Sequence, residues 1–181
     1  IMVRKAVRVC VVGAGVSGLV AIRELVAEGH DVQAFEKTDD VIGNWGNIYE
    51  TVQLLTSRRA TSFKGYPMPE GTPQFPTGQQ YRDYIRWFAK EAGLMRYIRF
   101  NTAVEAAVPV AGGSRGWDVR LSDGTTEHFD ALVAANGHLW APRIPEVEGK
   151  FDGPIFHTSQ YRSPADMAGD TVLVVGSGNS A

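Results

Sequence analysis

The chain has 181 residues and a formal net charge of −2, with 44% hydrophobic and 21% charged residues. This composition allows a buried core and argues against a disordered chain and against a nucleic-acid-binding protein, which usually carries a basic excess. The single cysteine excludes a disulfide framework and a Cys-based zinc site. No apolar run reaches the roughly 18–20 residues that cross a bilayer, and no secretory segment opens the chain. We therefore expect a cytoplasmic protein without a membrane span.

A strand–helix–strand unit is predicted at the start of the chain. Residues 7–12 form an apolar, β-branched run, typical of a strand buried on both faces of a parallel sheet. A glycine-rich turn follows over residues 13–18, and a helical pattern then ends at Gly29. A second strand is predicted over residues 31–36, which completes a βαβ unit.

The middle of the chain predicts a long loop and then a helix. Residues 49–76 have no clean period, and their aromatic content favours an ordered loop with little regular structure. Thr77 and Gln80 have the spacing of a capping box, so we expect the next helix to start there and to stop at Gly93.

Short strands dominate the remaining sequence. A hairpin turn is predicted at Asp123-Gly124, and a Pro-spaced connector follows over residues 142–154. The fold class predicted is α/β: a Rossmann-like dinucleotide-binding domain with a parallel sheet, a small antiparallel β-meander, and the start of a second Rossmann unit. The expected strands cover residues 97–100, 104–110, 117–121, 126–129, 130–135 and 170–175.

The first glycine motif meets the conditions for a dinucleotide site, because it follows a strand and opens a helix. Gly13 allows the tight turn, Gly15 lets the backbone approach a pyrophosphate, and Gly18 lets the helix pack close to the strand. The pyrophosphate would rest on the helix N-terminus. Glu36 ends the next strand and would accept hydrogen bonds from ribose hydroxyls. Since a carboxylate repels a 2′-phosphate, the site suits FAD or NAD and not NADP.

A second motif of the same kind ends the sequence. Gly176 and Gly178 follow the predicted strand over residues 170–175, with Ser180 and Ala181 in the remaining positions. Two dinucleotide sites in one chain imply electron transfer between two cofactors, and a flavin reduced by a nicotinamide is the common arrangement.

Several segments resemble the flavin-containing monooxygenases. The run from Phe151 to Arg162 fits the pattern F-x-G-x-x-x-H-x-x-x-Y/F-K/R, which resembles the identifying sequence of that family. Related Baeyer–Villiger monooxygenases have Trp where this chain has Tyr161, and Pro or Asp at position 162. Further resemblances lie in residues 35–37, 43–45 and 135–138, and residues 49–69 resemble the plant and fungal branches.

The resemblance implies a reaction in which NADPH reduces FAD and the reduced flavin traps O₂ as a C4a-hydroperoxide. The distal oxygen then passes to a soft nucleophile of a small-molecule substrate, an amine nitrogen or a sulfide sulfur. No metal site is expected. Thr56-Ser57 stands where the family has a T/S-N pair, so Ser57 is the candidate catalytic donor, with one hydrogen bond instead of an amide's two. Asn44 replaces the second glycine of the family's double glycine.

The candidate cofactor-binding residues follow from the glycine motifs and the resembling segments. They are Gly13, Gly15, Ser17, Gly18, Glu36, Lys37, Asn44, Trp45, Thr56, Val104, Gly137, Gly176, Gly178 and Ser180.

The resemblance also implies a division of the chain. Residues 1–145 are expected to be the N-terminal portion of the FAD-binding domain, 146–169 a connector, and 170–181 the start of a truncated NADPH-binding domain. As a fragment it would be inactive alone, and apolar surface at the cut would promote self-association. Two alternatives stay open: a module that keeps the fold without turnover, and a Baeyer–Villiger or oxidase relative.

Overall fold

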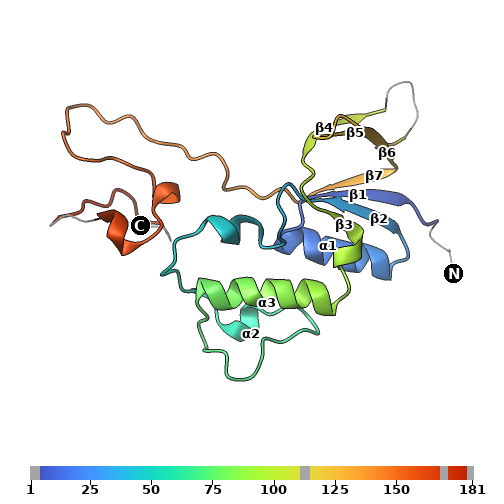
Figure 1. The fold of residues 1–181 in the computed structure, drawn as a ribbon, viewed down its shortest axis with the longest axis horizontal. Coiled ribbons are helices and arrows are strands. Elements are labelled where there is room, and N and C mark those ends of the chain that lie inside the picture. The colour runs from blue at the N-terminus through green and yellow to red at the C-terminus, as the bar shows by residue number, and fades with distance from the viewer. Residues whose placement is uncertain (1–4, 111–114, 168–170, 179–181) are drawn as a thin grey trace. The chain divides into compact units, whose positions relative to one another are not determined.

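The computed structural model describes residues 5–110, 115–167 and 171–178 (Figure 1). The chain divides into two compact units. The first unit contains residues 1–43 and 82–137, and the second contains residues 44–81 and 138–181. The two glycine motifs therefore belong to different units.

A parallel sheet forms the centre of the first unit, with strand order β3-β2-β1-β7. The apolar residues of β1 fit this place, because a central parallel strand is buried on both faces. Helix α1 (Val16–Ala27) joins β1 to β2 and packs on both strands (Figure 1). The strands are β1 (Arg8–Val12), β2 (Asp31–Phe35), β3 (Ile98–Arg99) and β7 (Ala131–Ala134).

An antiparallel sheet of three strands, in the order β4-β5-β6, completes the first unit. The strands are β4 (Val104–Pro109), β5 (Trp117–Leu121) and β6 (Thr126–Phe129). The predicted hairpin turn joins β5 to β6: Gly124 has φ +84° and donates its N–H to the Leu121 oxygen at 3.0 Å. The predicted α/β class, with a parallel sheet and a β-meander, is confirmed.

One apolar cluster joins the two sheets. Phe35 of β2 meets Phe129 of β6 edge to face, with ring centroids 6.0 Å apart and an interplanar angle of 86°. Aromatic pairs prefer this arrangement because the positive edge of one ring meets the negative face of the other. The buried members of the cluster are Cys10, Phe35, Val119, Leu121 and Phe129.

The Cys10 thiol should be inert in the folded protein. Its side chain is fully buried. This burial is the larger cause, and the negative charge of Glu127 the smaller one, of the rise in the pKa of the Cys10 thiol to about 12. The thiolate is the reactive form, so a thiol reagent at pH 8 should modify Cys10 only as fast as the protein unfolds. Rapid modification without denaturant would contradict this. A raised pKa also means that the stability from the neutral thiol is lost as the pH rises through 12.

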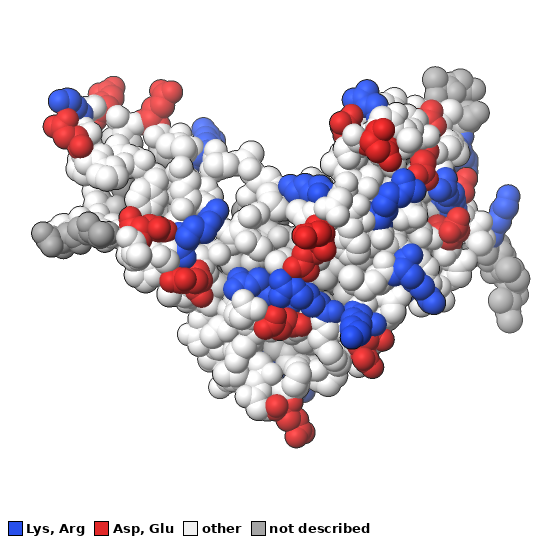
Figure 2. Space-filling model, in the orientation of Figure 1, with Lys and Arg blue, Asp and Glu red and all other residues white. Residues whose placement is uncertain are grey.

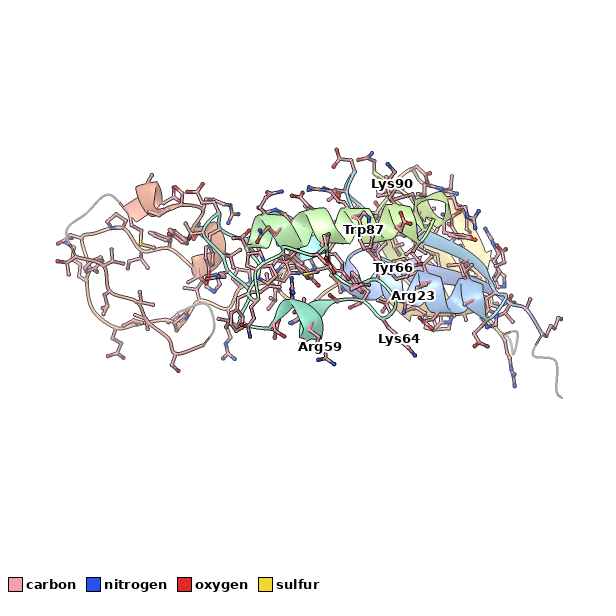
Figure 3. The ribbon with its side chains drawn as sticks, turned by 90° about the horizontal axis from the view of Figure 1, so that it is seen from below. Arg23, Arg59, Lys64, Tyr66, Trp87 and Lys90 are labelled. Atoms are coloured by element: carbon pink, nitrogen blue, oxygen red, sulfur yellow. The ribbon has the colours of Figure 1, made fainter. Side chains whose placement is uncertain are left out.

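The capping box at the start of α3 (Gly78–Glu91) is confirmed. Gln80 N–H donates to Thr77 Oγ1 at 3.2 Å, and Thr77 N–H donates to Gln80 Oε1 at 2.9 Å. Trp87 and Lys90 lie on the exposed side of the helix (Figure 3). The apolar face of the helix is buried at Tyr81, Tyr84, Ile85 and Phe88.

The long loop has little regular structure, as predicted, and contains a short helix, α2 (Arg58–Thr61), which Ser57 caps by accepting the Ala60 N–H at 3.3 Å. The strand predicted over residues 170–175 is wrong: residues 171–175 form no strand and Leu173 is 86% exposed, while residue 170 lies outside the described residues. An apolar run becomes a buried strand only beside partner strands, and no described strand pairs with it. The described 3₁₀ helices are η1 (Gly43–Asn47), η2 (Met95–Tyr97), η3 (Thr158–Gln160) and η4 (Pro164–Met167).

Acidic and basic side chains lie interspersed on the face shown in Figure 2. Among the helices of the described ranges, none has both the length and the apolar character needed to span a bilayer.

The β5–β6 turn should make folding sensitive to acid. The Asp123 carboxylate accepts hydrogen bonds from the Thr125 hydroxyl at 2.6 Å and the Thr125 N–H at 2.9 Å, which lower the pKa of Asp123. A lowered pKa gives stability that is present above the ordinary value of 3.8 and lost as the pH falls through the folded value. Asp123→Asn should therefore be less stable than the wild type at pH 7. Urea unfolding should show this difference shrinking below about pH 4. A difference independent of pH would contradict the assignment.

Candidate dinucleotide-binding site

The turn between β1 and α1 requires glycine at its first position. Gly13 has φ +92° and donates its N–H to the Phe35 oxygen at 2.8 Å. A Cβ at this position would lie 2.7 Å from the carbonyl oxygen of Ala135, the residue that follows β7. Both the backbone conformation and the space exclude a side chain, as the tight-turn interpretation predicts.

Helix α1 packs against this turn through Gly18. A Cβ on Gly18 would lie only 2.0 Å from the Gly13 carbonyl oxygen and 3.7 Å from the Ala135 Cβ. The close helix packing predicted for the third glycine is therefore present. The helix N-terminus faces no capping side chain, because its N-cap is Gly15, and its first turn contains no acidic residue. Such a terminus favours a bound anion.

Gly15 has a packing neighbour that the sequence does not reveal. Its Cβ position would face the Cα of Gly43 at 3.4 Å, and a Cβ on Gly43 would lie 3.2 Å from the Cα of Gly15. Gly43 has φ +53°. Two backbone segments distant in sequence thus approach each other where neither has a side chain. The expected approach of Gly15 to a pyrophosphate stays a prediction.

Glu36 lies beside the same turn and is only 5% exposed. Its Oε2 accepts the Ala14 N–H at 2.9 Å, and its Oε1 accepts the Thr38 N–H at 3.0 Å and the Thr38 hydroxyl at 2.9 Å. The backbone is held as well: the Glu36 N–H donates to the Arg99 oxygen, and the Thr102 N–H donates to the Glu36 oxygen. A buried carboxylate needs such donors to offset its lost hydration.

Four further candidates, Ser17, Lys37, Val104 and Gly137, also belong to the first unit. Ser17 and Lys37 are exposed. Val104 opens β4 and packs against the apolar cluster that contains Cys10. Gly137 follows β7 with φ +76°. No described group of three or more His, Cys, Asp or Glu side chains has a geometry that could hold a metal ion.

Candidates from the loop region belong to the second unit. Asn44 and Trp45 lie in η1, where the Trp45 ring meets the Tyr81 ring at 4.6 Å between centroids and 74°. The Thr56 hydroxyl lies 2.6 Å from the Thr61 hydroxyl. Ser57 uses its oxygen to cap α2 and keeps its hydroxyl proton for a further acceptor. This cap was not among the predicted elements, although serine before a short helix is the usual indication of one.

The second glycine motif is only partly described. Gly176 has φ +144°, and a Cβ on Gly178 would meet no atom within 4 Å. Ser180 and Ala181 lie outside the described residues.

A model of flavin-binding monooxygenase-like proteins matches residues 6–181. The chain belongs to this family. The N-oxide-forming dimethylaniline monooxygenase 2 of Oryctolagus cuniculus is 37% identical over 196 residues, which cover 97% of this chain and 36% of that protein. The chain therefore spans about a third of the length of the curated relatives it matches. The plant or fungal branch stays a prediction.

Solved structures are similar over most of the chain. S-allyl-L-cysteine S-oxygenase from Allium sativum has a TM-score of 0.80 and 29% identity, and the match covers 90% of this chain and 44% of that one. A complex of OTEMO with FAD and NADP has a TM-score of 0.72 and 32% identity, covering 85% of this chain and 30% of that one.

The segment from Phe151 to Arg162, which resembles the family's identifying sequence, forms hydrogen bonds within itself and to η1. The His157 Nδ1 accepts the Ser159 N–H at 3.1 Å, and Gln160 Oε1 accepts the His157 N–H at 2.9 Å, so the two form a capping box for η3. Arg162 donates to the oxygens of Asn47 at 3.1 Å and Ser159 at 2.7 Å. The motif thus ties residues 157–162 to the end of η1.

Proposed function

We propose that this chain forms the FAD-binding part of an FAD- and NADPH-dependent monooxygenase. The substrate would be a small molecule with a soft nucleophile, an amine nitrogen or a sulfide sulfur, and the oxidant O₂. One observation carries the proposal: the buried Glu36 carboxylate is joined to the Ala14 amide at 2.9 Å, beside a helix N-terminus without a capping side chain. A ribose acceptor and an anion-binding terminus thus occur together, as a dinucleotide requires.

The residues present fit FAD. Side chains are excluded at Gly13 and Gly18, where a Cβ would lie within 2.7 Å of backbone oxygens, so the backbone cradle can form. The N–H groups that begin α1 would hold the pyrophosphate, and the remaining lone pairs of Glu36 would accept ribose hydroxyls. Ser17, Lys37, Val104 and Gly137 are further proposed contacts.

Bound FAD would supply the hydride acceptor and the oxygen-activating group, which amino-acid side chains do not provide. Asn44, Trp45 and Thr56 are proposed to contact it. Ser57 would donate its hydroxyl proton to an acceptor near the flavin. Gly176, Gly178 and Ser180 are proposed for NADPH.

The family membership and the reactions named for relatives support the choice of reaction. One relative is N-oxide-forming, another is an S-oxygenase, and the OTEMO structure contains both FAD and NADP. The division into residues 1–145, 146–169 and 170–181 is part of the proposal. So is a cytoplasmic location, which the low cysteine content supports.

Reconstitution with FAD tests the proposal. After removal of free FAD, the protein should keep the blue-light absorption of oxidised flavin. A full-length version that contains this chain should then, with NADPH and O₂, convert a tertiary amine or a thioether to a product one oxygen heavier, measured by mass spectrometry against NADPH consumed. A colourless protein would refute FAD binding. Hydrogen peroxide as the only product would indicate an oxidase, and an ester from a ketone a Baeyer–Villiger enzyme.

A further inference from the structure

We propose that Thr38, Asp40 and Arg86 are positioning residues that hold the Glu36 carboxylate in place for the adenosine ribose of FAD. The inference rests on the proposed function, since it presupposes that Glu36 contacts the ribose. The three residues belong to the first unit, and none of them is among the residues that the sequence indicated.

Thr38 fixes one oxygen of the carboxylate. Glu36 Oε1 accepts both the Thr38 N–H at 3.0 Å and the Thr38 hydroxyl at 2.9 Å, whereas Oε2 accepts one donor among the described residues, the Ala14 N–H. The carboxylate plane is therefore held from two sides, by the turn after β2 and by the glycine turn. Each carboxylate oxygen has two lone pairs, so the less occupied Oε2 keeps capacity for a ribose hydroxyl.

Asp40 determines where the Thr38 hydroxyl points. Thr38 Oγ1 also lies 3.1 Å from the Asp40 carbonyl oxygen and 3.5 Å from the Asp40 N–H. A hydroxyl has one proton, and Glu36 Oε1 at 2.9 Å is a nearer acceptor for it than the Asp40 carbonyl at 3.1 Å, so the proton goes to Glu36 as long as Asp40 keeps this position. The backbone position of Asp40 therefore controls how well Thr38 serves the carboxylate.

Arg86 of α3 anchors Asp40. Its guanidinium donates to Asp40 Oδ2 through Nη2 at 2.7 Å and through Nε at 3.0 Å, and its Nη1 donates to Asp83 Oδ1 at 3.0 Å. The hydrogen bond to Asp40 is the main reason why the pKa of Arg86 is raised. Asp40 Oδ1 accepts the Val41 N–H at 2.7 Å, so the Asp40 carboxylate is bound both to α3 and to its own loop.

The partial exposure of this pair separates a positioning role from a stabilising one. The side chains of Arg86 and Asp40 are 43% and 28% exposed, and ion pairs at such sites contribute little to stability. Two N–H groups of the Arg86 guanidinium nevertheless donate to the Asp40 carboxylate, and this geometry fixes the orientation of the Asp40 side chain. The main effect of losing the pair should therefore be on ribose recognition, which depends on the orientation of the carboxylate.

Cofactor affinity measured with two ligands tests the inference. The ligands are FAD and its 2′-deoxyadenosine analogue, and dissociation constants are measured by flavin fluorescence in the protein. The wild type should prefer FAD by roughly tenfold. Thr38→Val removes the hydroxyl and keeps the shape of the side chain, and it should weaken FAD binding by about the same factor. The ratio of the dissociation constants of the deoxy analogue and FAD should fall towards one. Arg86→Met should shift both quantities in the same direction by a smaller factor.

Matched variants separate this role from a structural one. Thr38→Ser keeps the hydroxyl and should retain the preference for FAD, and Asp83→Asn removes the other partner of Arg86 without touching Asp40. Equal weakening of both ligands by Thr38→Val, with the preference intact, would overturn the inference. A wild type that binds neither ligand would instead refute the proposed function.

Discussion

Gly18→Ala is expected to destabilise the first unit by about 3 kcal/mol or more and to abolish FAD retention. The added methyl would lie 2.0 Å from the Gly13 oxygen and 2.9 Å from the Gly13 carbonyl carbon, both in the backbone of the turn. Helix α1 would have to move away from β1, and the N–H groups at its start would move with it. Urea unfolding followed by circular dichroism measures the loss.

The direction of this effect is informative because alanine is intrinsically the better helix residue. Replacing glycine inside a helix usually gains about 1 kcal/mol, so any destabilisation must come from the contact with Gly13. Ser17→Ala is the matched control, since Ser17 is exposed on the same helical turn. Its stability should stay within about 0.5 kcal/mol of the wild type. Equal stability of the two variants would contradict the packing assignment.

The βαβ start and the cap of α3 were predictable because their determinants are local. A glycine with positive φ, a β-branched strand and a capping box each act over a few residues, so Gly13, β1 and the Thr77–Gln80 pair follow from the sequence. The family was also predictable, because the segment from Phe151 to Arg162 resembles a known pattern.

The features that the sequence did not predict are contacts between residues far apart in the chain, or elements that need neighbouring strands. Arg86 meets Asp40 across 46 positions, and Arg162 meets Asn47 across 115, so no local pattern links them. The approach of Gly15 to Gly43 leaves no mark except two glycines. The apolar run over residues 171–175 has the local composition of a strand, which is why a strand was predicted there. A strand also needs neighbouring strands to satisfy its backbone hydrogen bonds, and local composition does not reveal whether they are present.

Glu36→Gln should reduce both the stability of the first unit and its affinity for FAD. The carboxylate accepts the Ala14 N–H on one oxygen and two Thr38 donors on the other. A glutamine offers one oxygen only, so its amide NH₂ would face a buried N–H donor on one side. An unsatisfied donor and a lost charged acceptor together cost about 2–3 kcal/mol, measured by urea unfolding without FAD.

The same variant separates folding from cofactor recognition. Glu28→Gln removes an exposed carboxylate near the end of α1 and should change stability by less than about 0.5 kcal/mol. If Glu36 serves the ribose, Glu36→Gln should also lose affinity for FAD, roughly tenfold or more, under conditions where the variant is fully folded. A folded variant with unchanged affinity would leave Glu36 as a structural carboxylate. The ribose contact would then have to come from another group, because the turn beside Glu36 would still bind the pyrophosphate.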